Sequence, residues 1–299
     1  MANQKSALKI ALIGANGQLG SDIASHFSQG DRYQLTALTR DDLDITNPEL
    51  VHRVLTSQNF DVVINSAAYV RVDDCEDQVK TAFDVNAIAA LNVARACREL
   101  EALCVYISTD YVFQGDRPDP YIESDIPNPI NIYGTSKLTG EYLVQQTVKR
   151  SLILRISSVF GKAGASGKGG NFIETIIKKA QAGDPLRVVN DIFMSPTYTH
   201  DAAKLLDELL QVGATGIIHG ANAGSCSWYE FATLALQLAK IDQPIAAIPA
   251  TEFVTKATRP MNSALRSDRL NSDLSAITSF QMRSWQEALN AYLAEKGYC

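Results

Sequence analysis

The chain has few of the features that mark a secreted, membrane-bound or nucleic-acid-binding protein. Its 5 cysteines are odd in number and form no C-x-x-C pair, so a disulfide framework and a zinc site are both unsupported and a reducing compartment is expected. No apolar run approaches the roughly 20 residues of a membrane span, and KIALIGA near the start is too short for a secretory core. The net charge of -6 argues against nucleic acid. We expect a soluble cytoplasmic protein with no membrane or nucleic-acid partner.

Short apolar runs alternate with helix-like stretches along the first half of the chain. Strands that are covered on both faces by helices read as near-continuous apolar runs, which is typical of parallel sheets. The sequence therefore predicts an α/β fold built on a Rossmann-like, doubly wound parallel sheet. The expected strands are 9–14, 33–39, 61–67, 103–109, 152–158, 186–190 and 216–221, and the expected helices are 18–27, 48–58, 81–100 and 133–146.

The alternation weakens after residue 160. A glycine-rich loop at 162–172 is followed by expected helices at 171–183, 227–240 and 283–296. We predict an NAD(P)-binding domain at 1–165 plus about 196–222, and a smaller, discontinuous C-terminal substrate-binding subdomain at about 166–195 and 223–299. In such sheets ligands bind outside the carboxyl ends of the strands, so the subdomain should close a substrate site there.

The stretch GANGQLG (14–20) directly follows the first expected strand and opens the first helix. A G-x-x-G-x-x-G turn allows the backbone to approach a pyrophosphate at a helix N-terminus. Ordinary strand-to-helix turns can also hold three glycines, but the βα units that follow favour a dinucleotide. The expected cofactor contacts here are Gly14, Asn16, Gly17, Gln18, Leu19 and Gly20.

The second expected strand ends in a mixed recognition signal. An acid at this position favours NADH, whereas an arginine suits the 2′-phosphate of NADPH. Here Arg40 comes first, with Asp41 and Asp42 directly behind it. We expect NADPH or NADH, with a slight preference for NADPH.

Tyr133 and Lys137 stand four residues apart in NIYGTSKLTGEYL, and on a helix they would share one face. Such a pair alone is more often a solvated surface pair. Thr109, at the carboxyl end of the fourth expected strand, would point a hydroxyl toward the same place. A phenol, an ammonium and a hydroxyl beside a dinucleotide form a constellation suited to proton transfer.

These motifs resemble the extended short-chain dehydrogenase/reductase superfamily, and more narrowly the dTDP-4-dehydrorhamnose reductase family. The motifs that carry this resemblance are GANGQLG, LDIT, NSAAYVRVDDCE, STDYVFQGD, YGTSKLTGE, GNF, SPTYT, SWYEFA and RPMNSALRS. The resemblance implies that Tyr133 donates a proton to a sugar carbonyl oxygen. It also implies that Lys137 lowers the pKa of that phenol and holds the nicotinamide ribose, and that Thr109 hydrogen-bonds the same carbonyl.

The resemblance implies further contacts. Asp44 and Ile45 would meet the adenine, and Ala67, Ala68 and Tyr69 would line the nicotinamide side. Asn86 would support the active-site helix, although a plain helix-interior asparagine explains it nearly as well. For each substrate-side candidate, loop or cap structure is the alternative: Asp110, Tyr111, Arg71, Asp73, Ser158, Asn171 and Arg259.

The departures from the family pattern cluster on the substrate side. Ser158 replaces a tryptophan that usually lies against the sugar, and loss of that ring should reshape the pocket. VRVD at 70–73, VVNDIFMSPTYT at 188–199 and the long loop at 162–172 also differ. The expected reaction is reduction of the 4-keto group of a nucleotide-linked 6-deoxyhexose, with dTDP-4-dehydro-β-L-rhamnose as the leading substrate.

Other functions share this pattern. One is a non-catalytic NADP-binding regulatory subunit that resembles the beta subunit of methionine adenosyltransferase. Another is an epimerase or dehydratase of nucleotide sugars, and the dehydratase is disfavoured because no glutamate follows Asp110. Asp22 matches an acid that holds interface magnesium in some relatives, but a solvated first-turn acid explains it better. The resemblance is compatible with a homodimer.

Overall fold

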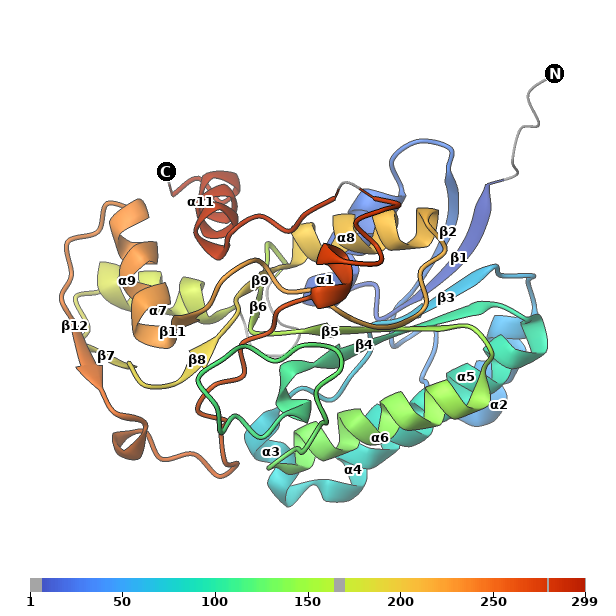
Figure 1. Ribbon diagram of the computed structural model, residues 1–299, viewed down its shortest axis with the longest axis horizontal. Coiled ribbons are helices and arrows are strands. Elements are labelled where there is room, and N and C mark those ends of the chain that lie inside the picture. The colour runs from blue at the N-terminus through green and yellow to red at the C-terminus, as the bar shows by residue number, and fades with distance from the viewer. Residues whose placement is uncertain (1–6, 164–169, 279, 299) are drawn as a thin grey trace.

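The computed structural model describes residues 7–163, 170–278 and 280–298, and a parallel sheet of six strands forms its centre (Figure 1). The strand order is β10-β5-β4-β3-β1-β2, and every neighbouring pair runs parallel. This confirms the predicted α/β class. The strands are β1 (Leu8–Ile13), β2 (Tyr33–Leu38), β3 (Val62–Asn65), β4 (Leu103–Thr109), β5 (Ser151–Ile156) and β10 (Gly216–His219).

Helices cover both faces of this sheet because alternate strand residues are apolar on both sides. On β1, Ile10 and Leu12 pack toward α1 (Gln18–Phe27) and α8 (Thr199–Gln211), whereas Ala11 and Ile13 pack toward the opposite layer. That opposite layer contains α2 (Pro48–Thr56), α5 (Ala89–Leu100) and α6 (Ile132–Thr147), which lie below the sheet in Figure 1. Each strand therefore contributes to two cores.

A third core lies beside the sheet, at the left of Figure 1. Its helices are α7 (Phe172–Gln181), α9 (Trp228–Leu238) and α11 (Trp285–Glu295), and it includes the paired strands β7 (Leu186–Val189) and β12 (Ile245–Ile248). Ser227 and Ser284 begin α9 and α11 with reciprocal capping boxes. The domain bounds given above remain a prediction, and the predicted loop at 162–172 lies partly outside the described residues.

The short elements complete the chain, and several of them border the carboxyl ends of the strands. The predicted helix at 81–100 is divided, because a π-helical turn, η1 (Asp84–Ile88), separates α4 (Val79–Phe83) from α5. The others are α3 (Val72–Asp77), η2 (Asp110–Val112), β6 (Val159–Phe160), β8 (Phe193–Met194), β9 (Thr197–Tyr198), β11 (Cys226–Ser227), η3 (Ala250–Glu252) and α10 (Asp268–Asn271).

Two global expectations can be compared with the structure. Cys75, Cys97, Cys104 and Cys226 are buried and form no disulfide, while Cys299 lies outside the described residues. Within the ranges that the structure describes, no helix is long and apolar enough to span a membrane.

Candidate active site

The glycine turn joins β1 to α1 with very little space around its backbone. Gly14 has φ +80°, a conformation that other residues adopt only with strain, and a Cβ there would lie 2.9 Å from the amide nitrogen of Ala67. A Cβ on Gly20 would lie 2.0 Å from the carbonyl oxygen of Gly14. Gly17 is the N-cap of α1 and offers no side-chain cap. The turn therefore presents bare backbone at a helix N-terminus, which suits a pyrophosphate.

Two side chains of this turn have structural roles. Gln18, which we predicted as a cofactor contact, is buried, and its amide donates to the carbonyl of Val159 at 3.1 Å. Leu19 is buried in the core between α1 and the sheet. Contact between these residues and a dinucleotide would therefore involve their backbone.

The segment after β2 lies where an adenosine would be expected. Arg40 is exposed. Hydrogen bonds from the hydroxyl and amide of Thr39 lower the pKa of Asp42, and equivalent bonds from Thr46 lower the pKa of Asp44. Both acids are thus ionised and bonded to their own loop, whereas Ile45 is buried. Asp41 and Asp42 are exposed as well, so this edge offers both an arginine and two acids to a cofactor.

Asn86 connects the end of β3 with the helix α6. Its side-chain oxygen accepts from the amide of Tyr69 at 2.8 Å, and its amide donates to the carbonyl of Tyr69 at 3.1 Å and to the hydroxyl of Ser136 at 3.0 Å. Its backbone carbonyl accepts from Tyr106 at 2.6 Å. Because Asn86 lies in the π turn η1, this fully buried residue holds the Ala67–Ala68–Tyr69 segment against α6.

Thr109 and Tyr133 meet at the carboxyl end of β4. Tyr133 lies in the first turn of α6 and makes a side-chain hydrogen bond with Thr109. Burial raises the pKa of Tyr133 above its ordinary value, and the bond with Thr109 acts in the opposite direction. The ring of Tyr111 packs edge-on against that of Tyr133, with centroids 5.9 Å apart. The phenol is therefore held as a neutral proton donor.

Lys137 lies one turn further along α6 and is buried. Its ammonium donates to the carbonyl of Ile107 at 2.7 Å and lies 4.0 Å from the centroid of the Tyr106 ring. Burial lowers the pKa of Lys137 to about 7, and the nearby Glu141 carboxylate acts in the opposite direction. The charge thus points at the backbone of β4, and the expected lowering of the Tyr133 pKa is not seen.

Two glycines that we did not single out from the sequence allow α6 to approach so closely. A Cβ on Gly134 would lie 2.0 Å from the carbonyl oxygen of Tyr111. A Cβ on Gly140 would lie 2.3 Å from the carbonyl oxygen of Asn86 and 2.4 Å from the hydroxyl of Tyr106. Glycine within a helix costs about 1 kcal/mol relative to alanine, so their presence in YGTSKLTG was a readable sign of tight packing.

Glu141, a further turn along α6, forms a buried ion pair that we also did not predict. Arg155 of β5 donates to its two carboxylate oxygens at 2.9 and 2.6 Å, and Ser108 donates to the first of them. Both charged side chains are almost fully enclosed, at 2% and 1% exposure. Arginine inside the otherwise apolar run LILRISS was the sequence sign of this pair.

Asp110, which we predicted to contact the sugar, has its carboxylate bonded within the protein. Asp110 is buried, and its carboxylate accepts hydrogen bonds from three hydroxyls: Thr109 at 2.9 Å, Ser157 at 2.8 Å and Ser263 at 2.5 Å. Burial raises its pKa, and these hydroxyls act in the opposite direction. Both carboxylate oxygens are therefore used within the protein.

Asn171 also has a structural role. Its side-chain oxygen caps α7 by accepting from the amide of Glu174 at 3.0 Å. Its amide group donates to the carbonyl of Gly161 at 3.1 Å and to Tyr292 at 2.8 Å. The predicted nucleotide contact would require this buried cap to be broken, which makes the cap the better explanation.

The remaining substrate-side candidates lie around α3. Arg259 pairs with Asp73 at 2.8 Å, and Asp73 also accepts from the amide of Ala257 at 3.1 Å. Arg71 pairs with Asp74 at 3.3 Å in an exposed position. Arg259 and Asp73 both act on the Tyr111 phenol electrostatically, so the structure brings these three together. Ser158 follows β5, with φ 43°.

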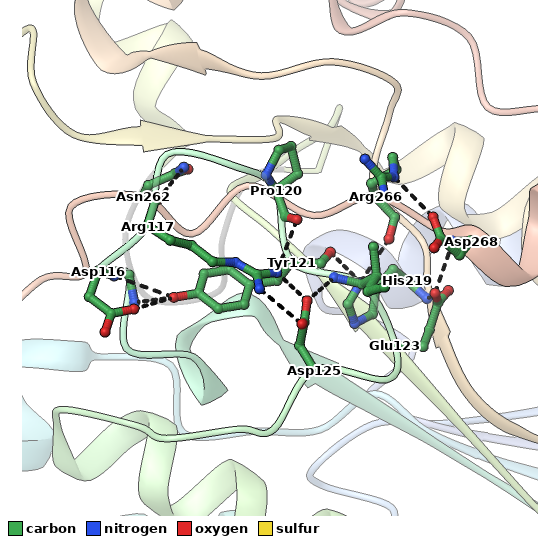
Figure 2. Close-up of polar contacts among 12 residues, drawn as sticks. Asp116, Arg117, Pro120, Tyr121, Glu123, Asp125, His219, Asn262, Arg266 and Asp268 are labelled. Carbon is green, nitrogen blue, oxygen red and sulfur yellow. Dashed lines mark hydrogen bonds and ion pairs between the residues drawn. The ribbon is translucent and has the colours of Figure 1, made fainter.

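Figure 2 shows how the loop after η2 is attached to the C-terminal segment. Glu123 accepts from the amides of His219 and Asp268, each at 3.0 Å. The ring Nδ1 of His219 lies 3.0 Å from the carbonyl of Tyr121, and burial lowers the pKa of this histidine to about 4, so it is neutral near pH 7. Asn262 donates to the carbonyl of Arg117 at 2.9 Å. The loop is thus bonded to β10 and to the C-terminal segment, which lie 96 to 145 residues further along the chain.

Among the positions that the structure describes, no group of three or more histidine, cysteine, aspartate or glutamate side chains could hold an ion. Asp22 accepts a hydrogen bond from Thr199 and lies near His200.

The doubly wound sheet, the glycine turn and the Thr109–Tyr133–Lys137 cluster define a nicotinamide-dependent oxidoreductase of the extended short-chain dehydrogenase/reductase class. The comparison with known proteins narrows this class. Residues 8–297 match the family model described as "RmlD substrate binding domain", and the chain belongs to that family.

Curated relatives and solved structures agree with this assignment. The chain is 38% identical to the spore coat polysaccharide biosynthesis protein SpsK of Bacillus subtilis, covering 96% of this chain and 98% of the relative. It is 35% identical to a dTDP-4-dehydrorhamnose reductase of Aggregatibacter actinomycetemcomitans, covering 94% and 97%. Its structure matches that of a Bacillus anthracis dTDP-4-dehydrorhamnose reductase in complex with NADP, with TM-score 0.91, 37% identity, and 97% and 99% coverage.

Proposed function

We propose that this protein reduces the 4-keto group of a nucleotide-linked 6-deoxyhexose with NADPH or NADH. The leading substrate is dTDP-4-dehydro-β-L-rhamnose, which would give dTDP-L-rhamnose. The observation that supports this proposal most directly is the hydrogen bond between Thr109 and Tyr133 at the carboxyl end of β4. The names of the similar proteins support the substrate class.

The residues fit a dinucleotide cofactor. The positive φ of Gly14 and the absence of a Cβ at Gly17 and Gly20 leave backbone exposed at the N-terminus of α1, where a pyrophosphate is favoured. Exposed Arg40 would contact a 2′-phosphate, which favours NADPH. When bound, the reduced nicotinamide supplies a hydride to the keto carbon.

The chain's own contribution is the proton. Tyr133 donates its phenolic proton to the keto oxygen, which becomes a hydroxyl group, and Thr109 orients the phenol through their hydrogen bond. Departure of the proton leaves a phenolate, and a buried ammonium one turn away would stabilise that charge after turning from the carbonyl of Ile107 toward Tyr133. Lys137 supplies the ammonium, and its pKa of about 7 means that both of its protonation states are populated near neutrality.

The residues proposed to contact the sugar are fewer than those proposed to bind the cofactor. Tyr111 packs against Tyr133 and interacts electrostatically with the Arg259–Asp73 pair, and we propose that these three residues contact the substrate. At Ser158 a small side chain in the left-handed region stands where the family usually has a tryptophan. A sugar with a different stereochemistry could use that room, so several substrates must be compared.

The test is a panel of nucleotide-linked 4-keto-6-deoxyhexoses, assayed with NADPH and with NADH by the absorbance of the reduced nicotinamide. We expect turnover with at least one sugar and a loss of about 10²- to 10⁴-fold in kcat for Tyr133→Phe, with NADPH affinity retained. Tyr142→Phe is the matched control, because Tyr142 lies on the same helix but is 49% exposed. Wild-type turnover in Tyr133→Phe would refute the acid role. Absence of turnover in the native protein, together with NADPH binding, would favour a regulatory subunit.

Two further properties belong to this proposal. Val79, Ile88 and Tyr142 are exposed apolar or aromatic side chains on α4, η1 and α6, which contact one another, and they support a homodimer built on these helices. Light scattering of the purified protein would test it. Cys97, Cys104 and Cys226 are buried and form no disulfide, which supports a cytoplasmic location. Cell fractionation would test it.

A further inference from the structure

We propose that Asp110 and Ser263 are positioning residues, which orient Thr109 for the reaction instead of binding the sugar. The inference rests on the proposed reduction and assigns a task to two residues of the same site. It starts from a buried carboxylate that receives three hydroxyl hydrogen bonds from three separate segments of the chain. We call Thr109, Asp110, Ser157 and Ser263 the hydroxyl cluster.

The hydroxyl cluster joins the central sheet to the C-terminal segment around residues 259–263, which we propose to contact the substrate. Thr109 ends β4 and Ser157 follows β5, so both belong to the central sheet. Ser263 comes from the opposite side: its amide donates to the carbonyl of Phe193 in β8 at 2.9 Å. In return the amide of Phe193 donates to the carbonyl of Met261 at 2.8 Å. Asp110 is thus the point where the C-terminal segment is bonded to the end of β4.

The same C-terminal segment holds the proposed substrate contacts. Arg259 lies four residues before Ser263 and pairs with Asp73 of α3. A nucleotide diphosphate that draws Arg259 away from Asp73 would pull on this segment, and the 2.5 Å bond between Ser263 and Asp110 would transmit the movement to Thr109. The contacts therefore connect Arg259 in the C-terminal segment with Thr109 at the carboxyl end of β4.

The direction of the hydrogen bonds shows what the cluster does for catalysis. The hydroxyl of Thr109 donates its only proton to Asp110, so its lone pairs face the amide of Tyr111 at 3.2 Å and the phenol of Tyr133. With Thr109 fixed as an acceptor, the phenol of Tyr133 donates its proton to Thr109, and a keto oxygen bound beside Thr109 would take that proton in its place. Asp110 has 3% exposure and cannot reach a sugar without giving up these bonds.

The variants that test this are Ser263→Ala, Asp110→Asn and the two combined. We expect Ser263→Ala to lower kcat about 10- to 100-fold, as a displacement near the reacting atoms does, while KM for the sugar and NADPH affinity stay within about threefold. Because Ser263 acts through Asp110, the double variant should be no slower than Asp110→Asn alone. Ser195→Ala is the matched control: Ser195 is also buried and bonds to Leu265, but it does not touch Asp110.

The kinetic results distinguish failure of the positioning role from failure of the proposed reductase function. If native protein turns over the sugar and Ser263→Ala keeps its kcat, the positioning role is wrong and the reductase assignment stands. A rise in KM that matches the fall in kcat, or losses that multiply in the double variant, would also overturn it, since they indicate direct contact with substrate or independent action. If native protein reduces no 4-keto sugar, the proposed function fails and the inference falls with it. Should Asp110→Asn not fold, Ser263→Ala and Ser157→Ala decide the question.

Discussion

Glu141→Gln should destabilise the protein far more than an ordinary charge removal. The substitution keeps the shape of the side chain but leaves Arg155 of β5 as a buried cation without a counter-charge, at a site where both partners are at most 2% exposed. Breaking such a pair from one side costs about 3–5 kcal/mol. An unfolding entropy of about 2.1 cal/mol/K per residue gives roughly 0.6 kcal/mol/K for a chain of this length. The expected fall in Tm is therefore about 5–8 °C.

Calorimetry of three variants would check this reasoning. Glu252→Gln breaks the pair between Arg187 and Glu252, whose side chains are 58% and 51% exposed, and should cost below about 1 kcal/mol. Glu141→Met combined with Arg155→Met removes both buried charges and should recover much of the loss. A Tm for Glu141→Gln within about 2 °C of the native value, or a double variant less stable than the single one, would refute the argument.

The remaining predictions concern the cofactor and the active-site lysine. The pKa of Lys137 in the folded protein is about 7, below the ordinary 10.5. Between these two pH values the folded protein therefore binds fewer protons than the unfolded chain. Its free energy of unfolding should rise by up to about 1.4 kcal/mol per pH unit as the pH increases. Lys137→Met removes this dependence, so urea unfolding should show a difference from native protein that changes between about pH 7 and pH 10; a constant difference would contradict it. Gly20→Ala, whose Cβ would lie 2.0 Å from a carbonyl oxygen, should weaken NADPH binding at least about tenfold. Gly30→Ala, at φ +75° but with nothing within 4 Å, should lower stability through backbone strain and leave the NADPH affinity measured by fluorescence titration unchanged. Arg40→Ala should raise KM for NADPH about tenfold and spare NADH; equal changes would show that Arg40 does not meet the 2′-phosphate.

The central fold was predictable because its signals are local. Each strand of the large sheet is a short apolar run, and each was expected within a few residues of its observed bounds. The helix α8 was not expected, although its residues 199–211 include a row of buried alanines and leucines. The strand β12 was also missed: it has only four residues, two of them exposed, and it pairs with β7 outside the main sheet. Pairing of that kind depends on tertiary contacts.

The residues of the candidate site could be named from the sequence, but the hydrogen bonds that hold them could not. The four-residue spacing placed Tyr133 and Lys137 on one helix face, and the end of the fourth strand together with the family resemblance pointed to Thr109. Asp110 sits in the same motif, yet nothing local shows that Ser263, 153 positions later, donates to it. Burial and partners decide whether a polar residue meets a ligand or the protein itself, and single-sequence spacing contains neither.

The π-helical turn at Asp84–Ile88 makes this region sensitive to residue count as well as to residue type. Such a turn places one residue more than an α-helical turn would hold, and here Asn86 uses it to reach both Tyr69 and Ser136. Deleting any one residue of the turn would restore a regular helix and rotate everything before it by roughly 100° relative to everything after it. Substitutions at exposed positions of this helix should therefore be tolerated, whereas deletion of one residue would break the bonds by which Asn86 connects Tyr69, after β3, to Ser136 of α6.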